Sequence, residues 1–423
     1  MINDLIKFID ESPTAFKAIA NIEKILINNG YEKLNKEKIQ KNKKYYITRN
    51  DSSIIAFNVG KKLNDPSVHI VASHSDCPSM KLKPNPIIVT DMAVKLDVEE
   101  YGGMLYRPWF DRPLSIAGRV IVKEKGKITS RIFMDEEPFC IIPSMAPHLD
   151  RNIEDKKPDL AVDMVPIITL NKNFDFNAYL ANKLKVKKEN ISGFDLYLYP
   201  IQKGYVWSDK KEFFTCGHID NLESAYTSLL GFLNNFNDNN INIYACFDNE
   251  EVGSLSRQGA DSDFLKASIE RICKDLSLDY MSLINQGMML SIDNAHGLHP
   301  NHAELYDLNN APRLNEGVVI KYNAAQSYTT DSLSCALLKK IMDDHKIKYQ
   351  YFTNKTGRRG GGTLGNKASR HVSILSVDIG LSQWAMHSPV ETAGVKDVKY
   401  MVDTCKYFFK AHIKVNSDNS YTI

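Results

Sequence analysis

The stretch Val68-His-Ile-Val-Ala-Ser-His74-Ser-Asp76 carries the main clue to the fold. Its apolar part, 68–73, has the length and composition of a buried strand, and it ends directly in polar side chains. Further along the chain, helix-like and strand-like patterns alternate, which is typical of a mostly parallel sheet covered by helices. The expected strands are 241–247, 288–292 and 372–377, and the expected helices are 221–236, 264–276, 331–344 and 397–412. The sequence therefore predicts an α/β fold with a mixed, mostly parallel sheet flanked by helices.

The segment 83–213 differs from its surroundings. Short strand-like pieces alternate there with turn residues such as Pro84 and Gly102-Gly103, and the regular helix–strand alternation is missing. We therefore expect an inserted β-rich domain at 83–213. Residues 1–82 and 214–423 would together form the second domain, which the insertion interrupts.

The N-terminal residues 2–30 are expected to form two helices. Ser12 is a suitable N-cap for the second helix, with Pro13 at its first position and Gly30 as a stop signal. The opening run MINDLIKFIDES carries acidic residues inside its apolar pattern, which a secretory signal would not. This pattern argues against secretion, and the odd number of scattered cysteines fits a cytoplasmic protein.

Composition excludes several classes of function. The 423 residues include 53 Lys and Arg against 51 Asp and Glu, so a net charge of +2 provides no broad field for nucleic acid or an anionic membrane. No window of about 18 apolar residues could span a bilayer. The seven cysteines form no C-x-x-C pair, which indicates reduced thiols and argues against a thiolate metal site. Neither nucleic acid nor a membrane is expected as a partner.

Histidines and acidic residues follow the ends of the predicted strands. The residues concerned are His74, Asp76, Asp248, Glu250, Glu251, Asp293 and His387, and Asp220 stands just before a predicted helix. In open α/β sheets, ligands bind beyond the carboxyl ends of the strands. So many carboxylates on one edge would repel one another unless cations neutralised them. Imidazole and carboxylate ligands without thiolate suit zinc, manganese or cobalt, and two divalent ions would balance three carboxylates and a hydroxide.

Such a two-metal site activates a water molecule for hydrolysis, and a carboxylate that is not a metal ligand can act as general base. The adjacent Glu250 and Glu251 can share these roles if the strand ends before them. The alternative for any one of these residues is a cap, turn or surface role, and Asp220 and Asp293 could be helix caps. His218 and His302 are assigned to that class, whereas His296 and His299 stay open.

Five motifs together resemble the aspartyl aminopeptidase family of co-catalytic zinc exopeptidases. They are His74-Ser-Asp76, Gly217-His-Ile-Asp-Asn221, Asp248-Asn-Glu-Glu-Val-Gly-Ser254, Ser291-Ile-Asp-Asn-Ala-His-Gly-Leu-His-Pro-Asn301 and Met386-His-Ser388. The resemblance runs from the N-terminal helices to the last helix, in family order. It implies a metalloaminopeptidase that removes single N-terminal residues from peptides, in which 1–82 and 214–423 form the catalytic domain.

The resemblance also implies individual roles. The metal ligands would be His74 and Asp293 on one ion, Glu251 and His387 on the other, and Asp220 between them. Glu250 would be the general base, and Asp76 would orient His74. The inserted domain would form dimers, commonly assembled into dodecamers in this family. His148, within Ala146-Pro-His-Leu-Asp-Arg-Asn152, would reach the active site of a neighbouring subunit.

Substrate contacts are implied at two places. Lys321 aligns with a lysine that pairs with acidic substrate side chains, but Ala325 and Ser327 stand where eukaryotic relatives are basic, so neutral residues stay open as substrates. Gly362 and Thr363 lie in a Gly-rich stretch that resembles the substrate loop of the family.

Two other functions stay open from the sequence. A two-metal phosphoester hydrolase would need basic groups that converge on the site, for which Arg358 and Arg359 are the candidates. A catalytically inactive assembly protein would not need the complete ligand set. Cys77 is expected to form part of the site wall.

Overall fold

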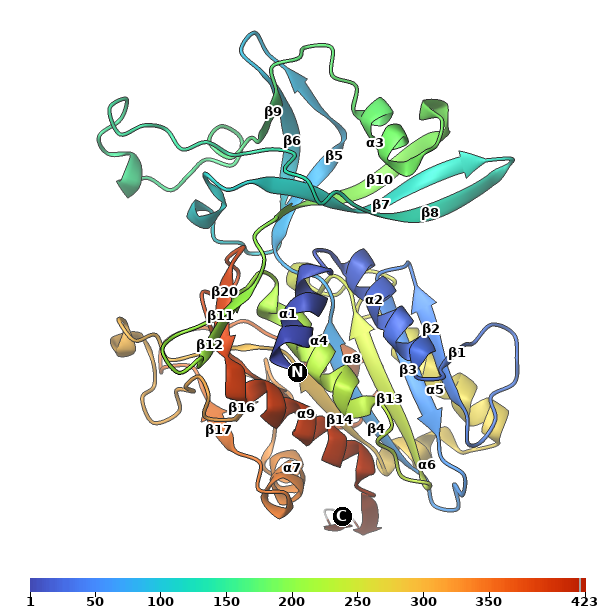
Figure 1. The fold of residues 1–423 in the computed structure, drawn as a ribbon. Coiled ribbons are helices and arrows are strands. Elements are labelled where there is room, and N and C mark those ends of the chain that lie inside the picture. The colour runs from blue at the N-terminus through green and yellow to red at the C-terminus, as the bar shows by residue number, and fades with distance from the viewer. Residues whose placement is uncertain (418–419) are drawn as a thin grey trace.

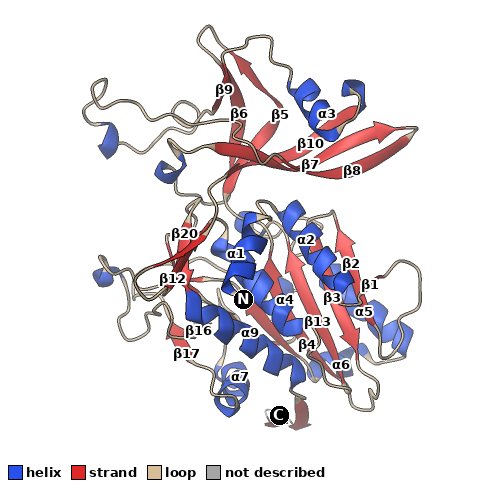
Figure 2. Ribbon diagram, in the orientation of Figure 1, coloured by secondary structure: helices blue, strands red, loops and turns tan. Residues whose placement is uncertain are grey.

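The computed structural model describes residues 1–417 and 420–423. Its largest sheet has nine strands in the order β1-β2-β3-β13-β4-β14-β18-β16-β17 (Figures 1 and 2). The strands are β1 (Glu32–Lys33), β2 (Lys44–Arg49), β3 (Ser53–Val59), β4 (Ser67–His74), β13 (Asn240–Phe247), β14 (Met288–Ile292), β16 (Val318–Lys321), β17 (Tyr349–Phe352) and β18 (Leu375–Gly380). The central strands β13, β4, β14 and β18 are parallel, whereas β3 and β16 pair antiparallel with their neighbours β13 and β18. The sheet is therefore mixed and mostly parallel at its centre, as predicted.

Helices cover both faces of this sheet (Figure 1). One face packs against α1 (Ile2–Asp10), α2 (Ala15–Asn28), α4 (Ile219–Phe232), α7 (Ser332–Asp344) and α9 (Val395–Lys410). The other packs against α5 (Phe264–Leu276), α6 (Tyr280–Asn285) and α8 (Leu364–Ser369). Along β13, Tyr244 and Cys246 point into the first core and Ile243 and Ala245 into the second, because successive side chains of a strand face opposite sides. Burial on both faces explains why the central strands are continuous apolar runs.

Several boundaries differ from the sequence-based expectation: for example, α4 ends at Phe232 rather than at residue 236, and α9 begins at Val395 rather than at residue 397. The N-cap of α2 is Thr14 rather than Ser12: Thr14 has extended backbone angles and its hydroxyl accepts a hydrogen bond from the Lys17 amide (3.4 Å). Ser12 instead accepts a hydrogen bond from the Asn21 side chain (3.0 Å). Strand β18 begins at Leu375, three residues later than expected, because its pairing with β14 starts there.

A separate six-stranded sheet forms the upper part of the molecule in Figure 1. Its order is β8-β7-β10-β5-β6-β9, and all of its pairings are antiparallel. The strands are β5 (Ser79–Val89), β6 (Val94–Tyr101), β7 (Leu114–Glu124), β8 (Lys127–Met134), β9 (Ile167–Thr169) and β10 (Ile191–Pro200), accompanied by α3 (Phe176–Leu184). This region has its own apolar core around Trp109 and Leu196. It is the β-rich region of the fold, and its longer strands correct the expectation of short pieces. The domain boundaries at 83 and 213 stay a prediction.

The remaining elements are smaller. A five-stranded sheet contains β11 (Tyr205–Trp207), β12 (Phe213–Cys216), β15 (Ala295–His296), β19 (Ser382–Trp384) and β20 (Glu391–Gly394), and a two-stranded sheet contains β21 (Lys414–Ser417) and β22 (Ser420–Thr422). Short 3-10 helices are η1 (Arg107–Trp109), η2 (Ile153–Asp155), η3 (Lys188–Asn190), η4 (Glu250–Val252) and η5 (Ala303–Leu305). Within the described residues, no helix is both long enough and apolar enough to cross a bilayer.

Candidate metal centre

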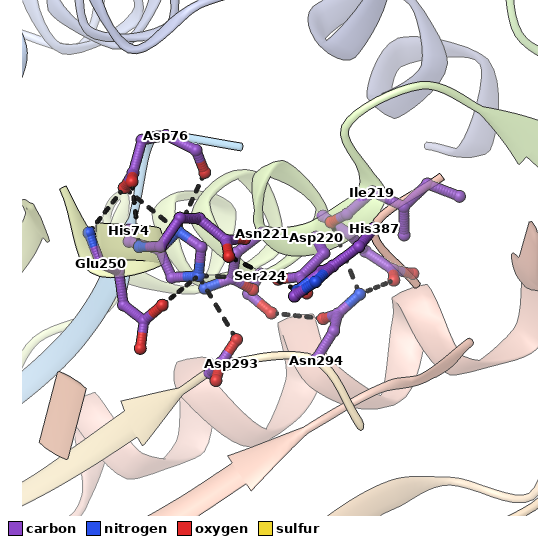
Figure 3. Close-up of polar contacts among 12 residues, drawn as sticks. His74, Asp76, Ile219, Asp220, Asn221, Ser224, Glu250, Asp293, Asn294 and His387 are labelled. Atoms are coloured by element: carbon purple, nitrogen blue, oxygen red, sulfur yellow. Dashed lines mark hydrogen bonds and ion pairs between the residues drawn. The ribbon is translucent and has the colours of Figure 1, made fainter. Parts of the chain in front are cut away.

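The candidate ligands meet at one edge of the large sheet (Figure 3). His74 is the last residue of β4, Asp293 directly follows β14, and η4 follows β13 and carries Glu250 and Glu251. The carboxyl ends of parallel strands lie at the same edge, which is why residues distant in sequence come together. Asp220, at the start of α4, and His387, between β19 and β20, complete the group.

The hydrogen bonds of His74 determine which of its ring nitrogens carries the proton. Nδ1 lies 3.0 Å from the Asp76 carbonyl oxygen and 3.4 Å from Asp76 Oδ1. Both are acceptors, so Nδ1 carries the proton. Nε2 then faces Asp220 Oδ1 at 3.6 Å and Asp293 Oδ1 at 3.4 Å. Burial alone would lower the pKa of His74, but Asp220, Asp293 and Asp76 outweigh burial and raise the pKa well above its ordinary value. The surroundings of Nε2 therefore favour positive charge.

His387 is held in the same way on the other side of Asp220. Its Nδ1 lies 2.8 Å from the carbonyl oxygen of Gly103, which can only accept, so Nδ1 again carries the proton. Nε2 faces Asp220 Oδ2 at 3.6 Å and Glu251 Oε2 at 3.4 Å. Although burial lowers the pKa of His387, Asp220 and Glu251 raise it to about 10. This is a second position that favours positive charge.

Two clusters, His74–Asp220–Asp293 and Asp220–Glu251–His387, share the carboxylate of Asp220, and His74, Glu250 and Glu251 form a third group of possible ligands. In these two clusters, each histidine Nε2 lies 3.4–3.6 Å from its carboxylate oxygens, close to the roughly 3.3–3.4 Å expected between ligands around a tetrahedral ion with bonds of about 2.0–2.1 Å. Asp220 Oδ1 is buried and has no hydrogen-bond partner among the described residues. A nitrogen and oxygen donor set without thiolate suits zinc, manganese or cobalt. The residues therefore fit a pair of divalent cations that share one carboxylate.

Glu250 and Glu251 have different surroundings although they are adjacent. The Glu251 side chain is 5% exposed and belongs to the cluster with His387, whereas the Glu250 side chain is 17% exposed and its Oε2 lies 4.0 Å from His74 Nε2. Burial, together with Asp293, Asp76 and Asp220, raises the pKa of Glu250 to about 8. Glu250 thus borders both the cluster and the solvent, with a pKa near neutrality.

Asp76 connects His74 to η4. Beyond its contact with His74, its Oδ1 accepts a hydrogen bond from the amide of Glu250 and its Oδ2 accepts one from the amide of Glu251, both at 3.1 Å. Asp76 therefore orients a candidate ligand and also fixes the backbone that carries the two glutamates. Asp248, which the sequence also placed at this edge, lies outside all clusters and accepts a hydrogen bond from the Asn249 amide (2.8 Å).

Sequence reasoning missed Glu391, the first residue of β20. Its carboxylate is buried and accepts hydrogen bonds from the amides of Asp220 (2.9 Å) and His387 (2.8 Å) and from the Gln383 side chain (3.1 Å). One buried carboxylate thus holds the backbone of two candidate ligands. The available signal was an acidic residue four positions after His387.

Sequence reasoning also missed Tyr101, the last residue of β6. Its hydroxyl donates a hydrogen bond to Asp76 Oδ2 (2.8 Å). Burial and the negative charge of Asp76 raise the pKa of Tyr101, so the hydroxyl keeps its proton. This contact comes from the β-rich region, and no local sequence pattern links it to the metal ligands.

Of the predicted substrate residues, Lys321 contacts a candidate ligand. Lys321, at the end of β16, is buried: its Nζ donates a hydrogen bond to the Asn294 carbonyl (2.8 Å) and lies 3.4 Å from Asp293 Oδ2. Thr363 is the N-cap of α8, and its hydroxyl donates to Asp378 Oδ1 (2.5 Å). Gly362 is exposed beside it.

Other candidates lie outside the clusters. His148 is exposed on the loop that precedes η2. The His296 ring packs against Tyr306 and Phe352, while His299 contacts His302. The basic residues that a phosphoester hydrolase would need, Arg358 and Arg359, are exposed on the Gly-rich loop. Cys77 lines a small cavity beside Asp76.

Comparisons with known proteins identify the family of the chain. The family described as aminopeptidase I zinc metalloprotease (M18) matches residues 8–409. The chain is 39% identical to a probable M18 family aminopeptidase 2 of Clostridium novyi (strain NT), over 96% of this chain and 98% of that protein. A structure described as the Ape4 and Nbr1 complex superposes with a TM-score of 0.92 at 31% identity, covering 96% of this chain and 85% of the other. The S. cerevesiae mApe1 dodecamer superposes with a TM-score of 0.84 at 25% identity, covering 96% of each chain.

Proposed function

Because the chain belongs to the M18 family of zinc metalloprotease aminopeptidases, we propose that it removes single N-terminal residues from peptides by means of a water molecule activated between two divalent cations. The observation that carries the proposal is the shared carboxylate: Asp220 presents one oxygen to His74 and the other to His387. A single-ion site would not need a second histidine and a second carboxylate on the far side of Asp220. Zinc is the proposed metal, and manganese or cobalt would also suit the donors.

The two carboxylate oxygens of Asp220 divide the proposed ligands into two sets. His74 and Asp293 would hold one ion and Glu251 and His387 the other, with Asp220 between them. When bound, such a pair of ions lowers the pKa of a water molecule and polarises the carbonyl group that the water attacks. The tautomers fixed by the Asp76 and Gly103 carbonyl oxygens leave the Nε2 lone pairs free for this binding.

Glu250 is the proposed general base. It takes the proton of the attacking water and returns it to the amine that leaves. Burial in the site raises the pKa of Glu250 above that of a free glutamate, which favours proton transfer in both directions near neutral pH. Its greater exposure than Glu251 supports access to water and substrate.

Lys321 is proposed to contribute to the choice of substrate. Its ammonium group has three donors, and Asn294 and Asp293 account for two of them, which leaves one for an acidic substrate side chain. Gly362 and Thr363 would line the same part of the site. Neutral first residues stay an alternative, and a panel of peptides that differ only in the first residue measures this preference.

We propose self-association through the β-rich region, as dimers that assemble into a dodecamer. The dodecamer formed by the similar mApe1 supports this assembly. In such a dimer, His148 would approach the active site of the partner and stabilise the negative charge that develops on the attacked carbonyl. The exposure of His148 on a loop supports this role.

The substitution Glu250→Gln tests the assignment of the base. We expect the variant to keep two metal ions per chain, because Glu250 is not among the proposed ligands, while peptidase kcat falls about 10²–10⁴-fold. Metal analysis and peptide hydrolysis measure the two effects. The matched variant Glu251→Gln removes a proposed ligand instead, and we expect it to lose metal as well as activity. Unchanged turnover of Glu250→Gln would remove Glu250 as the base, and loss of metal would make it a ligand.

A further inference from the structure

We propose that Tyr101, contributed by the β-rich region, is a positioning residue of the catalytic site: its hydroxyl fixes Asp76 and, through it, the general base and one metal-ligand cluster. This inference rests on the proposed function and gives the β-rich region a role in catalysis that is separate from self-association. The hydroxyl does not touch a proposed metal ligand, so its effect passes through neighbouring groups.

The direction of each hydrogen bond at Tyr101 is determined by its neighbours. Asn249 turns its side-chain oxygen toward two donors, Ser256 Oγ (2.7 Å) and Gln258 Nε2 (2.9 Å). The side-chain nitrogen of Asn249 therefore donates to the Tyr101 hydroxyl oxygen (2.8 Å). The hydroxyl hydrogen is left for Asp76 Oδ2 at 2.8 Å. One hydroxyl thus bridges an amide donor and a buried carboxylate.

Both partners of Tyr101 control the position of η4. Asn249 immediately precedes Glu250 and adopts a left-handed backbone conformation with φ of +63°, which asparagine tolerates better than most residues. Asp76 accepts the amides of Glu250 and Glu251 and contacts His74. Without the hydroxyl, Asp76 Oδ2 would lose one of its two hydrogen-bond donors. The Asn249 side chain would lose its acceptor, and Asn249 and Asp76 would no longer be linked through the tyrosine. We therefore expect η4 and the His74 ring to be less well fixed.

The segment that follows Tyr101 contacts the second cluster as well. The Gly103 carbonyl orients His387, and the Leu105 amide donates a hydrogen bond to the His387 carbonyl (3.0 Å). Gly102 passes so close to η4 that an added Cβ would lie 3.0 Å from Cβ of Glu251. The same short segment of the β-rich region therefore contacts both sides of the site. The Tyr197 ring from β10 packs edge-on against the Tyr101 ring, with ring centroids 5.4 Å apart. This contact holds Tyr101, at the start of the segment, in place.

The test is the substitution Tyr101→Phe in the full-length, metal-loaded protein, since it removes the hydroxyl and keeps the packed ring. At saturating metal, we expect kcat to fall about 10-fold or more while KM stays within about twofold, because outer hydrogen bonds to a metal site commonly change activity or metal affinity by about 10–100-fold. Competition with a chromogenic chelator should show a zinc dissociation constant about 10-fold higher. The oligomeric mass and the melting temperature should match those of the wild type.

The control is Tyr106→Phe, which removes another hydroxyl from the same part of the chain. Tyr106 donates only to the exposed carboxylate of Glu100 (3.1 Å) among the hydrogen bonds described for it, so kcat and zinc affinity should stay at wild-type values. The inference is overturned if Tyr101→Phe keeps wild-type kcat and zinc affinity, if Tyr106→Phe loses as much, or if the loss accompanies dissociation of the oligomer. A wild-type protein without peptidase activity would instead overturn the proposed function.

Discussion

At the scale of single residues, the carboxylates of the site differ in what their oxygens accept. Asp76 and Glu391 accept hydrogen bonds from backbone amides. These bonds satisfy the two carboxylates, which thereby position the backbone of the site. Asp220 Oδ1 is buried without such a donor among the described residues and faces the His74 ring nitrogen at 3.6 Å, and burial of a polar atom that accepts no hydrogen bond is costly. A bound cation removes this cost. The positioning carboxylates therefore differ from the proposed ligands in that they accept hydrogen bonds from backbone amides.

Glu391→Gln is expected to weaken one metal position more than the other. The amide nitrogen of glutamine cannot accept a hydrogen bond, so the amide of Asp220 or that of His387 would lose its partner. We expect the affinity for the ion held by Glu251 and His387 to fall about 10–100-fold. Metal content after dialysis against graded chelator concentrations measures this change.

The exposed Glu316, which pairs with Lys348, provides the matched control, since Glu316→Gln changes the same group away from the site. If both ions bind Glu391→Gln with the same affinity as the wild type, the Glu391 hydrogen bonds do not position the ligands.

The same distinction explains which site residues could be predicted from the sequence. Ligands such as His74 and Asp293 follow apolar strands, where their residue type is chemically informative. Glu391 acts through backbone amides, and Tyr101 reaches Asp76 from another sheet. Contacts of this kind depend on the folded backbone and leave no periodic pattern, so sequence reasoning did not find them.

At the scale of elements, strands and helices with strong patterns were predicted well and their ends less well. The bounds of α5 and β14 agree with the expectation, because amphipathic spacing and a fully buried strand leave little choice. The start of β18 was wrong because 372–379 is apolar at many positions, and only the pairing of Leu375 with Met288 decides where the strand begins. The strand also ends later than expected, at Gly380, which places Asp378 inside β18 instead of after it.

Inside the strand, Asp378 connects two loops beside the site. Its Oδ2 accepts the amide (2.6 Å) and the hydroxyl (2.8 Å) of Thr329, and its Oδ1 accepts the hydroxyl of Thr363. Asp378→Asn would replace an acceptor by a donor and loosen at least one loop. We expect KM to rise about 10-fold, with kcat and metal content near wild-type values, because Thr363 belongs to the proposed substrate loop and neither threonine is a proposed metal ligand. Steady-state kinetics and metal analysis check this expectation.

Asp344→Asn serves as the control for Asp378→Asn, because Asp344 forms an exposed ion pair with Lys340 at the end of α7. An unchanged KM for Asp378→Asn, or a loss of metal, would contradict a role for Asp378 in holding the substrate loops.

At the scale of the whole molecule, the β-rich region connects an exposed loop to the site. Arg107 donates hydrogen bonds to the carbonyl oxygens of Ile153 and Lys156, and it follows closely after the segment that contacts His387. The loop exposes large apolar side chains, with Leu149 79% and Val162 72% exposed. Contiguous exposed apolar surface is typical of interaction sites, so this loop is a candidate contact for the proposed self-association. Figure 1 shows this loop extending from the side of the β-rich region.

Mixing two inactive variants tests whether His148 acts on a partner subunit. In a dimer of His148→Ala and Glu250→Gln chains, one site would combine an intact Glu250 from the first chain with an intact His148 from the second. If subunits exchange at random in equal amounts, half of the dimers are mixed and each has one complete site of two. Activity should therefore recover to about a quarter of the wild-type value.

The design distinguishes contribution across the interface from contribution within one chain. If His148 acted on the site of its own chain, every site of the mixed dimer would lack either His148 or Glu250, and mixing would restore nothing. Recovery should also require subunit exchange, so the two variants mixed without prior dissociation should stay inactive. Full activity of His148→Ala alone would show that this histidine is not needed, and the exposed loop would then serve assembly only.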